Sequence, residues 1–157
     1  MFKKVPFGSD GTGVSAHFWD NVGNLGCQDL SSMQCPKCYG ETEQVISSGD
    51  DTMRIDRCLL CHGMYIDQLT REDFGTLETL INVDSSDVEV GSEYDEMVYV
   101  ECPKCDKIMD QRLLETPVRI RFELCPSCHS TFLDAGELRL YLSKEYRQAF
   151  EELLPQR

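Results

Sequence analysis

The sequence predicts a small α+β fold that is stabilised by metal. Two tandem modules each consist of a β-hairpin and a helix, and a long C-terminal helix follows. Each half of the chain contains two Cys-x-x-Cys pairs with nineteen residues between them, and the halves repeat with a constant offset of 67 positions. When 157 residues are divided between two such modules, each is too small to bury an adequate apolar core without a metal.

The cysteine spacing predicts the metal ligands. The first module contains Cys35, Cys38, Cys58 and Cys61, and the second contains Cys102, Cys105, Cys125 and Cys128. Two Cys-x-x-Cys pairs separated by about 15–20 residues are typical of a four-thiolate zinc site. Four thiolates complete a tetrahedron with no open position, so the sequence predicts two structural Zn²⁺ ions.

The repeat extends beyond the cysteines. Met53-Arg54-Ile55 corresponds to Ile120-Arg121-Phe122, and Tyr65-Ile66-Asp67 corresponds to Phe132-Leu133-Asp134. A complete second copy in one register indicates a tandem repeat of one metal module. We therefore expect each metal to be bound within one module and not between the two.

These motifs resemble a small bacterial zinc-ribbon family named for its likeness to the zinc ribbon of transcription factor IIB. Residues 102–138 carry the resemblance most fully, through the cysteines and Phe132-Leu-Asp-Ala-Gly-Glu-Leu138. Residues 35–67 share the cysteines and Tyr65-Ile66-Asp67, but Gln68-Leu-Thr replaces Ala-Gly-Glu, and His62 and His129 stand where the family has glycine. The two copies cover about half of the chain. The resemblance implies two tandem zinc ribbons and an association with the transcription or translation machinery.

We expect four segments in the chain. They are a Gly-rich N-terminal arm (1–30), zinc ribbon 1 with its following helix (31–82), an acidic linker (83–97), and zinc ribbon 2 with the C-terminal helix (98–157). Apolar residues at helical spacing follow ribbon 1, at Phe74, Leu77, Leu80 and Ile81. In ribbon 2, Val118, Ile120 and Phe122 alternate with polar residues, which is typical of a half-buried strand.

The C-terminal helix is predicted over Ala135 to Leu154. Asp134 and Glu137 have the spacing of a capping box at its start. The apolar face of this helix must be covered by another surface. It consists of Leu138, Tyr141, Leu142, Ala149, Phe150, Leu153 and Leu154. This face needs a surface from the N-terminal aromatics, the first module or a second chain. We expect it to dock within a monomer, with Phe18 and Trp19 of the arm as the main contributors, and a homodimer through the helix is the alternative.

The remaining features concern location. The first residues contain no apolar run typical of a signal peptide, and no stretch could span a membrane, so we expect a cytoplasmic protein with reduced thiols. The cysteines are then metal ligands and not disulfides, and Cys27, outside both modules, is a spare thiol. His62 and His129 are expected to be exposed turn residues or hydrogen-bonding groups beside the metal ligands.

Charge restricts the partners. The formal net charge is −13, and residues 76–100 contain seven acids and no Lys or Arg, which predicts a solvated linker and weak or no binding of nucleic acid. Residues 101–142 are nearly balanced and contain the candidate nucleic-acid contacts Lys104, Lys107, Arg112, Arg119, Arg121 and Arg139. Lys37, Lys104, Arg54 and Arg121 recur in the repeat, and we interpret them as charge compensation near the metal-thiolate centres.

The sequence contains no catalytic triad, paired carboxylates or open metal site, so we expect no enzymatic activity. The favoured function is a zinc-binding protein-interaction adaptor or regulator with an unidentified protein partner. A nucleic-acid-binding zinc-ribbon regulator is one alternative. A rubredoxin-like iron electron carrier is the other, because a tetrahedron of four thiolates also suits iron.

Overall fold

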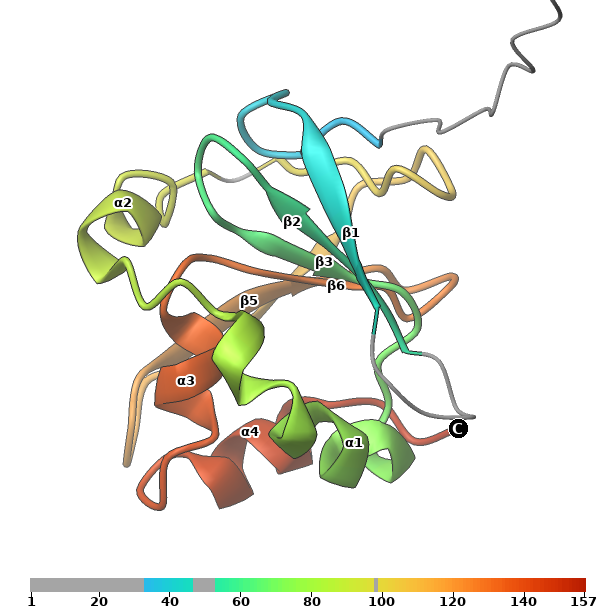
Figure 1. The fold of residues 1–157 in the computed structure, drawn as a ribbon. Coiled ribbons are helices and arrows are strands. Elements are labelled where there is room, and N and C mark those ends of the chain that lie inside the picture. The colour runs from blue at the N-terminus through green and yellow to red at the C-terminus, as the bar shows by residue number, and fades with distance from the viewer. Residues whose placement is uncertain (1–32, 47–52, 98) are drawn as a thin grey trace, which may run out of the picture. The chain divides into compact units, whose positions relative to one another are not determined.

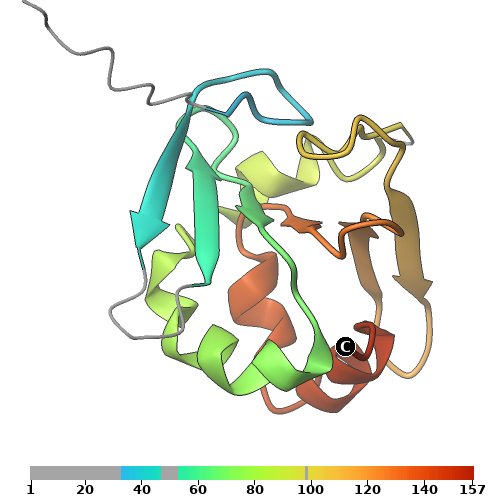
Figure 2. The same cartoon turned by 90° about the vertical axis from the view of Figure 1, so that its right-hand side faces the viewer.

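The computed structural model describes residues 33–46, 53–97 and 99–157, and it places one six-stranded antiparallel sheet at the centre of this region. The strand order is β1-β2-β3-β6-β5-β4 (Figures 1 and 2). The first three strands come from the first module and the last three from the second. The N-terminal arm lies outside the described residues, together with Cys27 and the expected contacts of Phe18 and Trp19.

Each cysteine spacer forms the predicted hairpin. In the first module, β1 (Thr42–Ile46) pairs with β2 (Arg54–Cys58), and in the second, β4 (Asp110–Leu114) pairs with β5 (Ile120–Leu124). Val118, Ile120 and Phe122 are all buried, as their spacing predicted. Glu123 is also buried, at 3% exposure. The alternation of apolar and polar residues had placed it on the solvent face, so the prediction was wrong for this residue.

The third strands of the two modules pair with each other, which local sequence patterns did not predict. β3 (Met64–Ile66) lies antiparallel to β6 (Thr131–Leu133), and the register sets Tyr65 opposite Phe132. These two residues are equivalent in the repeat. An antiparallel pairing centred on equivalent residues relates the flanking strands by an approximate two-fold axis. The modules are therefore two halves of one sheet.

The two faces of the sheet carry separate apolar cores. Because successive residues of a strand point to opposite faces, Met64 and Ile66 contact the core on the helical side, whereas Tyr65 contacts the core that contains the cysteines. Leu133 and Phe132 divide in the same way. Both faces of β3 and β6 are thus covered, and every residue of these strands is buried.

The helices are short. In the first module η1 (Arg71–Asp73), α1 (Phe74–Thr79) and η2 (Ile81–Val83) follow β3, and α2 (Val88–Ser92) lies in the connection to the second module. Helices α3 (Glu137–Tyr141) and α4 (Arg147–Leu153) follow β6. Phe74, Leu77 and Leu80 are buried, as their spacing predicted. None of the helices in the described residues is long and apolar enough to cross a membrane.

The prediction of one long C-terminal helix was wrong. The chain turns between α3 and α4, where the Ser143 carbonyl accepts hydrogen bonds from the amides of Tyr146 and Arg147. A continuous helix would separate residues 141 and 150 by about 13 Å along its axis. The turn instead brings the rings of Tyr141 and Phe150 to 5.1 Å, and Phe150 also meets Phe122 at 5.3 Å. Burial of three aromatic rings in one cluster outweighs the intrinsic helix preference.

Part of the expected acidic linker is ordered against the second module. Asp84 is buried, and its carboxylate accepts hydrogen bonds from the amides of Gly136 (2.8 Å) and Arg139 (3.0 Å) at the start of α3. Amides in the first turn of a helix lack partners within the helix, and a carboxylate satisfies them well. Asp84 therefore anchors the start of this segment to α3, while Glu89, Glu93 and Glu96 are exposed to solvent.

Candidate metal centres

Four turns with the same backbone geometry present the cysteines. In the turn that starts at Cys35, the amide of Cys35 donates to Gly40 O (2.9 Å) and the amide of Tyr39 donates to Cys35 O (3.0 Å). The turns at Cys102 and Cys125 repeat both bonds, and the turn at Cys58 repeats the first. The residue after each pair has a positive φ: Tyr39 (59°), His62 (59°), Asp106 (53°) and His129 (59°). This tight turn makes both sulfur atoms of a pair point to the same side.

The first candidate centre lies where the turn before β1 meets the turn between β2 and β3. It consists of Cys35, Cys38, Cys58 and Cys61. The Sγ atoms of Cys35 and Cys61 are 3.6 Å apart, and those of Cys38 and Cys58 are 3.4 Å apart. A tetrahedral zinc with Zn–S bonds of about 2.3 Å sets its sulfur atoms about 3.8 Å apart. The four sulfurs therefore fit a metal ion with a small expansion.

The second candidate centre has the same construction in the second module. It consists of Cys102, Cys105, Cys125 and Cys128, and the Sγ atoms of Cys102 and Cys128 are 3.6 Å apart. In both centres all four sulfur atoms lie within 4.8 Å of one another. All eight cysteines are free thiols. The structure thus brings each predicted set of four together, and the two sets could hold two metal ions.

The chemistry of the donor atoms also fits a metal. Thiolate is the form of cysteine that binds metals. The hydrogen bond from the Cys61 thiol lowers the pKa of Cys35 to about 5, so this cluster loses its first proton readily. Four sulfur donors are the ligands of structural zinc and of rubredoxin-type iron, and they exclude magnesium and calcium, which prefer oxygen.

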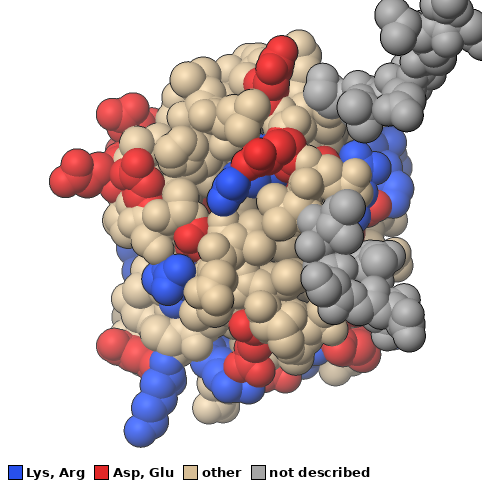
Figure 3. All heavy atoms as spheres, in the orientation of Figure 1, with Lys and Arg blue, Asp and Glu red and all other residues tan. Residues whose placement is uncertain are grey.

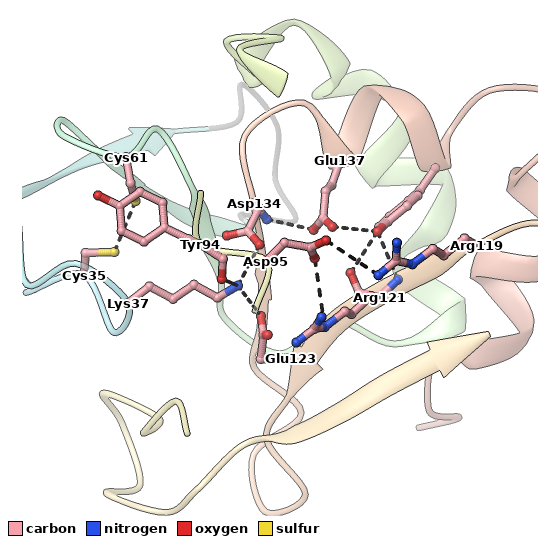
Figure 4. Close-up of polar contacts among 11 residues, drawn as sticks. Cys35, Lys37, Cys61, Tyr94, Asp95, Arg119, Arg121, Glu123, Asp134 and Glu137 are labelled. Carbon is pink, nitrogen blue, oxygen red and sulfur yellow. Dashed lines mark hydrogen bonds and ion pairs between the residues drawn. The ribbon is translucent and has the colours of Figure 1, made fainter. Parts of the chain in front are cut away.

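The lysine in the first turn is held by the second module. Lys37 lies between Cys35 and Cys38, and its side chain is 1% exposed. Its ammonium is 2.7 Å from Asp134, 3.1 Å from Glu123 and 3.4 Å from the carbonyl oxygen of Tyr94 (Figure 4). Burial alone would lower the pKa of Lys37, but the two carboxylates outweigh it and raise this pKa. The lysine is therefore positively charged, and its ammonium contacts two carboxylates and one carbonyl oxygen.

The lysine in the equivalent turn of the second module makes the reciprocal contact. Lys104 lies 67 positions after Lys37, and Asp67 lies 67 positions before Asp134. Lys104 Nζ is 2.9 Å from Asp67 Oδ1, and the side chains are 51% and 27% exposed. Each module thus binds a carboxylate of the other through the lysine of its first turn. One of these two ion pairs is buried and the other is exposed.

The other recurring basic residues also have carboxylate partners. Arg54 donates to Asp56 at 2.9 Å, and Arg121 lies 3.9 Å from Asp95. The interpretation of these residues as charge compensation for the metal centres is therefore replaced by specific contacts with carboxylates. Arg119 is also 3.9 Å from Asp95, which comes from the acidic segment after α2.

Sequence reasoning missed a group of polar residues beside the second module. A cavity of about 280 Å³ is lined by residues of α2, β5 and α3 and of the segments beside them, including Asp95, Arg121, Glu137 and Tyr141. Asp95, Asp134 and Glu137 approach one another there. Asp134 is already bound to Lys37, and Glu137 accepts a hydrogen bond from the amide of Asp134 at 2.8 Å. Only the spacing of Asp134 and Glu137 in the sequence pointed to this contact.

The surroundings of Glu137 favour the neutral form of its carboxyl group. Burial raises its pKa well above the usual range, and the nearby Asp134 adds to the effect. The Tyr141 hydroxyl can donate to Glu137 Oε1 at 2.7 Å or to the carbonyl oxygen of Arg121 at 2.8 Å.

Comparisons of the chain with protein-family models, with curated proteins and with solved structures found no match.

Proposed function

We propose that this chain is a non-catalytic, zinc-binding protein-interaction adaptor. Two zinc ions, each bound by four cysteine thiolates, stabilise a scaffold. This scaffold presents a docking surface for a protein. Support for structural metal comes from the complete sets of four sulfurs, which leave no coordination position for a substrate. The resemblance to zinc ribbons of the transcription factor IIB type suggests a partner in the transcription or translation machinery.

One observation carries the proposal of a docking surface. The turns of the first centre expose three large apolar side chains, Tyr39 (74%), Leu59 (54%) and Leu60 (63%), which we call the apolar tip. In the second module the equivalent positions are Asp106, Pro126 and Ser127. Both tips have the same backbone geometry, so the turn itself does not require apolar residues. At these three equivalent positions the exposed apolar side chains occur in the first module only, and such a group is typical of a surface that binds another protein.

The surroundings of the apolar tip indicate a basic partner. The segment that contains α2 lies beside the first centre, since Tyr94 O accepts a hydrogen bond from Lys37 and Asp87 Oδ2 is 3.8 Å from His62 Nδ1. This segment carries seven acids and no basic residue between positions 76 and 100, and Figure 3 shows acidic side chains projecting around α2 at the left. We therefore infer a partner segment with apolar residues and Lys or Arg.

A peptide titration tests this surface. The probe is a synthetic helix of Leu, Trp and Lys, and its control is the same peptide with Glu in place of Lys. The basic peptide should bind, more weakly at high salt, and Leu59→Ser with Leu60→Ser should reduce its affinity about tenfold or more, because burying a leucine contributes about 1.5–3 kcal/mol. Leu113→Ser, on edge strand β4 and 48% exposed, is the matched control and should bind as the parent does.

Other outcomes would overturn the proposal. Equal binding of both peptides, or binding that survives the tip variants, would show that the tip is not a selective docking surface. Micromolar binding of RNA or DNA at physiological salt, lost when Arg119 and Arg121 are changed to Ala, would favour the nucleic-acid regulator. A dimer that the tip variants split into folded monomers would identify a second copy of the chain as the occupant.

A further inference from the structure

The two centres have the same cysteines and the same turns, but their surroundings differ. Tyr65 belongs to β3 of the first module, and its hydroxyl lies 3.6 Å from the Sγ of Cys102 in the second centre. The tyrosine is 3% exposed, and a phenol hydroxyl ordinarily keeps its proton at neutral pH. When Cys102 binds a metal it is a thiolate and can only accept. Tyr65 is therefore the donor in this hydrogen bond.

A second contact joins the first module to the same centre. Ser130 Oγ lies 3.0 Å from Cys128 Sγ and 3.2 Å from Asp67 Oδ1, and its single proton can be donated to either of them. The ammonium of Lys104 lies 2.9 Å from the same carboxylate oxygen. Asp67 comes from the first module, and the lysine offsets its charge beside the metal thiolates. Two cysteines of the second centre are thus linked to side chains of the first module, one directly and one through Ser130.

The first centre lacks these groups. The residue equivalent to Tyr65 is Phe132, which has no hydroxyl, and the residue equivalent to Ser130 is Gly63. A Cβ atom on Gly63 would lie 2.4 Å from the ring of Phe132, so the phenylalanine occupies the space that a serine side chain would need. At these two pairs of positions the second centre has two hydroxyl groups near its sulfurs and the first centre has none.

We propose that Tyr65 of the first module is a positioning residue for the second metal centre, which the first module therefore completes. A hydrogen bond to a ligand fixes its orientation and tunes its bond to the metal, and loss of such a group costs about 10–100-fold in metal affinity. The two centres should respond differently to the loss of this hydroxyl. Removal of the Tyr65 hydroxyl weakens metal binding in the other module and leaves metal binding in its own module unchanged. This inference is independent of the proposed docking function.

Metal release resolved by centre tests the proposal. The zinc-loaded full chain is exposed to a chelator, pulsed with N-ethylmaleimide and digested, and mass spectrometry of the peptides reports alkylation of each cysteine. In Tyr65→Phe, the cysteines of the second centre should become reactive about tenfold to a hundredfold faster than in the parent. Those of the first centre should keep the parental rate, although Tyr65 is in their own module.

Tyr141→Phe is the matched control, because it also removes a buried hydroxyl, and that hydroxyl contacts Arg121 and Glu137 and no cysteine. It should leave the ratio of the two release rates unchanged. Equal acceleration at both centres in Tyr65→Phe would indicate general destabilisation and would overturn the proposal. No acceleration at the second centre would overturn it as well, since the hydroxyl would then contribute nothing to metal binding.

Discussion

The ammonium of Lys37 lies 2.7 Å from the carboxylate of Asp134, and this contact joins the first metal centre to the second module. Its counterpart in the repeat, Lys104 with Asp67, joins the second centre to the first module. Together with the pairing of β3 and β6, these reciprocal contacts make the two modules one folding unit. The two repeats thus form a single sheet with an approximate two-fold axis.

The two lysines should differ strongly in their effect on stability. Lys37→Met leaves Asp134 and Glu123 buried without a cation, and we expect a loss of about 3–5 kcal/mol in the free energy of unfolding. Lys104→Met breaks an exposed pair and should cost at most about 1 kcal/mol. Denaturant unfolding of the zinc-loaded variants measures both. Similar losses for the two would show that the buried pair has no special role.

Phe150 should be one of the most sensitive apolar positions. It is fully buried and contacts Phe74 of the first module and Phe122 of the second. Phe150→Ala should reduce the free energy of unfolding by about 3–5 kcal/mol. The mass in solution should remain that of the parent, because the contacts lie within one chain. A parent dimer that this substitution converts to folded monomers would indicate an oligomer interface instead.

Glu137 should make the stability of the protein depend on pH. Its pKa in the folded protein is raised, so the folded state holds the proton more tightly than the unfolded state does. Its contribution is therefore full below the unfolded pKa of about 4.3 and is lost as the pH rises towards the folded value. Glu137→Gln, which can still form a hydrogen bond with the Tyr141 hydroxyl, should flatten this decline and be at least as stable as the parent at neutral pH. If Glu137 is ionised in the folded protein, unfolding curves over a pH series would show the same loss of stability with rising pH in the variant as in the parent.

The histidines after the cysteine pairs should be dispensable for metal binding. His62 and His129 each have a φ of 59°, a conformation that costs a residue with a side chain about 1–2 kcal/mol. His129→Gly removes this strain, but glycine also increases the conformational entropy of the unfolded chain and so offsets part of the gain. The free energy of unfolding should therefore rise by up to about 1 kcal/mol. Metal content should stay the same. Loss of a metal ion in this variant would mean that the histidine is a ligand.

The sequence predicted the parts that depend on local spacing. The two sets of four cysteines, both hairpins and the buried stripe at Phe74, Leu77 and Leu80 follow from short-range patterns. The pairing of β3 with β6 did not, since three-residue strands carry little pattern and their pairing joins distant segments. The turn near Ser143 was missed because tertiary contacts of Phe150 override helix propensity. The partner of Lys37 was missed because a cross-module ion pair has no sequence signal without the fold.

The metal content of the purified full chain tests the central claim most directly. Native mass spectrometry and elemental analysis, after expression with both zinc and iron available, should give two zinc ions and no iron per chain. Removal of both ions by a chelator should unfold the sheet, because structural zinc contributes roughly 10–16 kcal/mol in small domains. One metal per chain, iron in place of zinc, or a metal-free chain with an intact sheet would contradict the account.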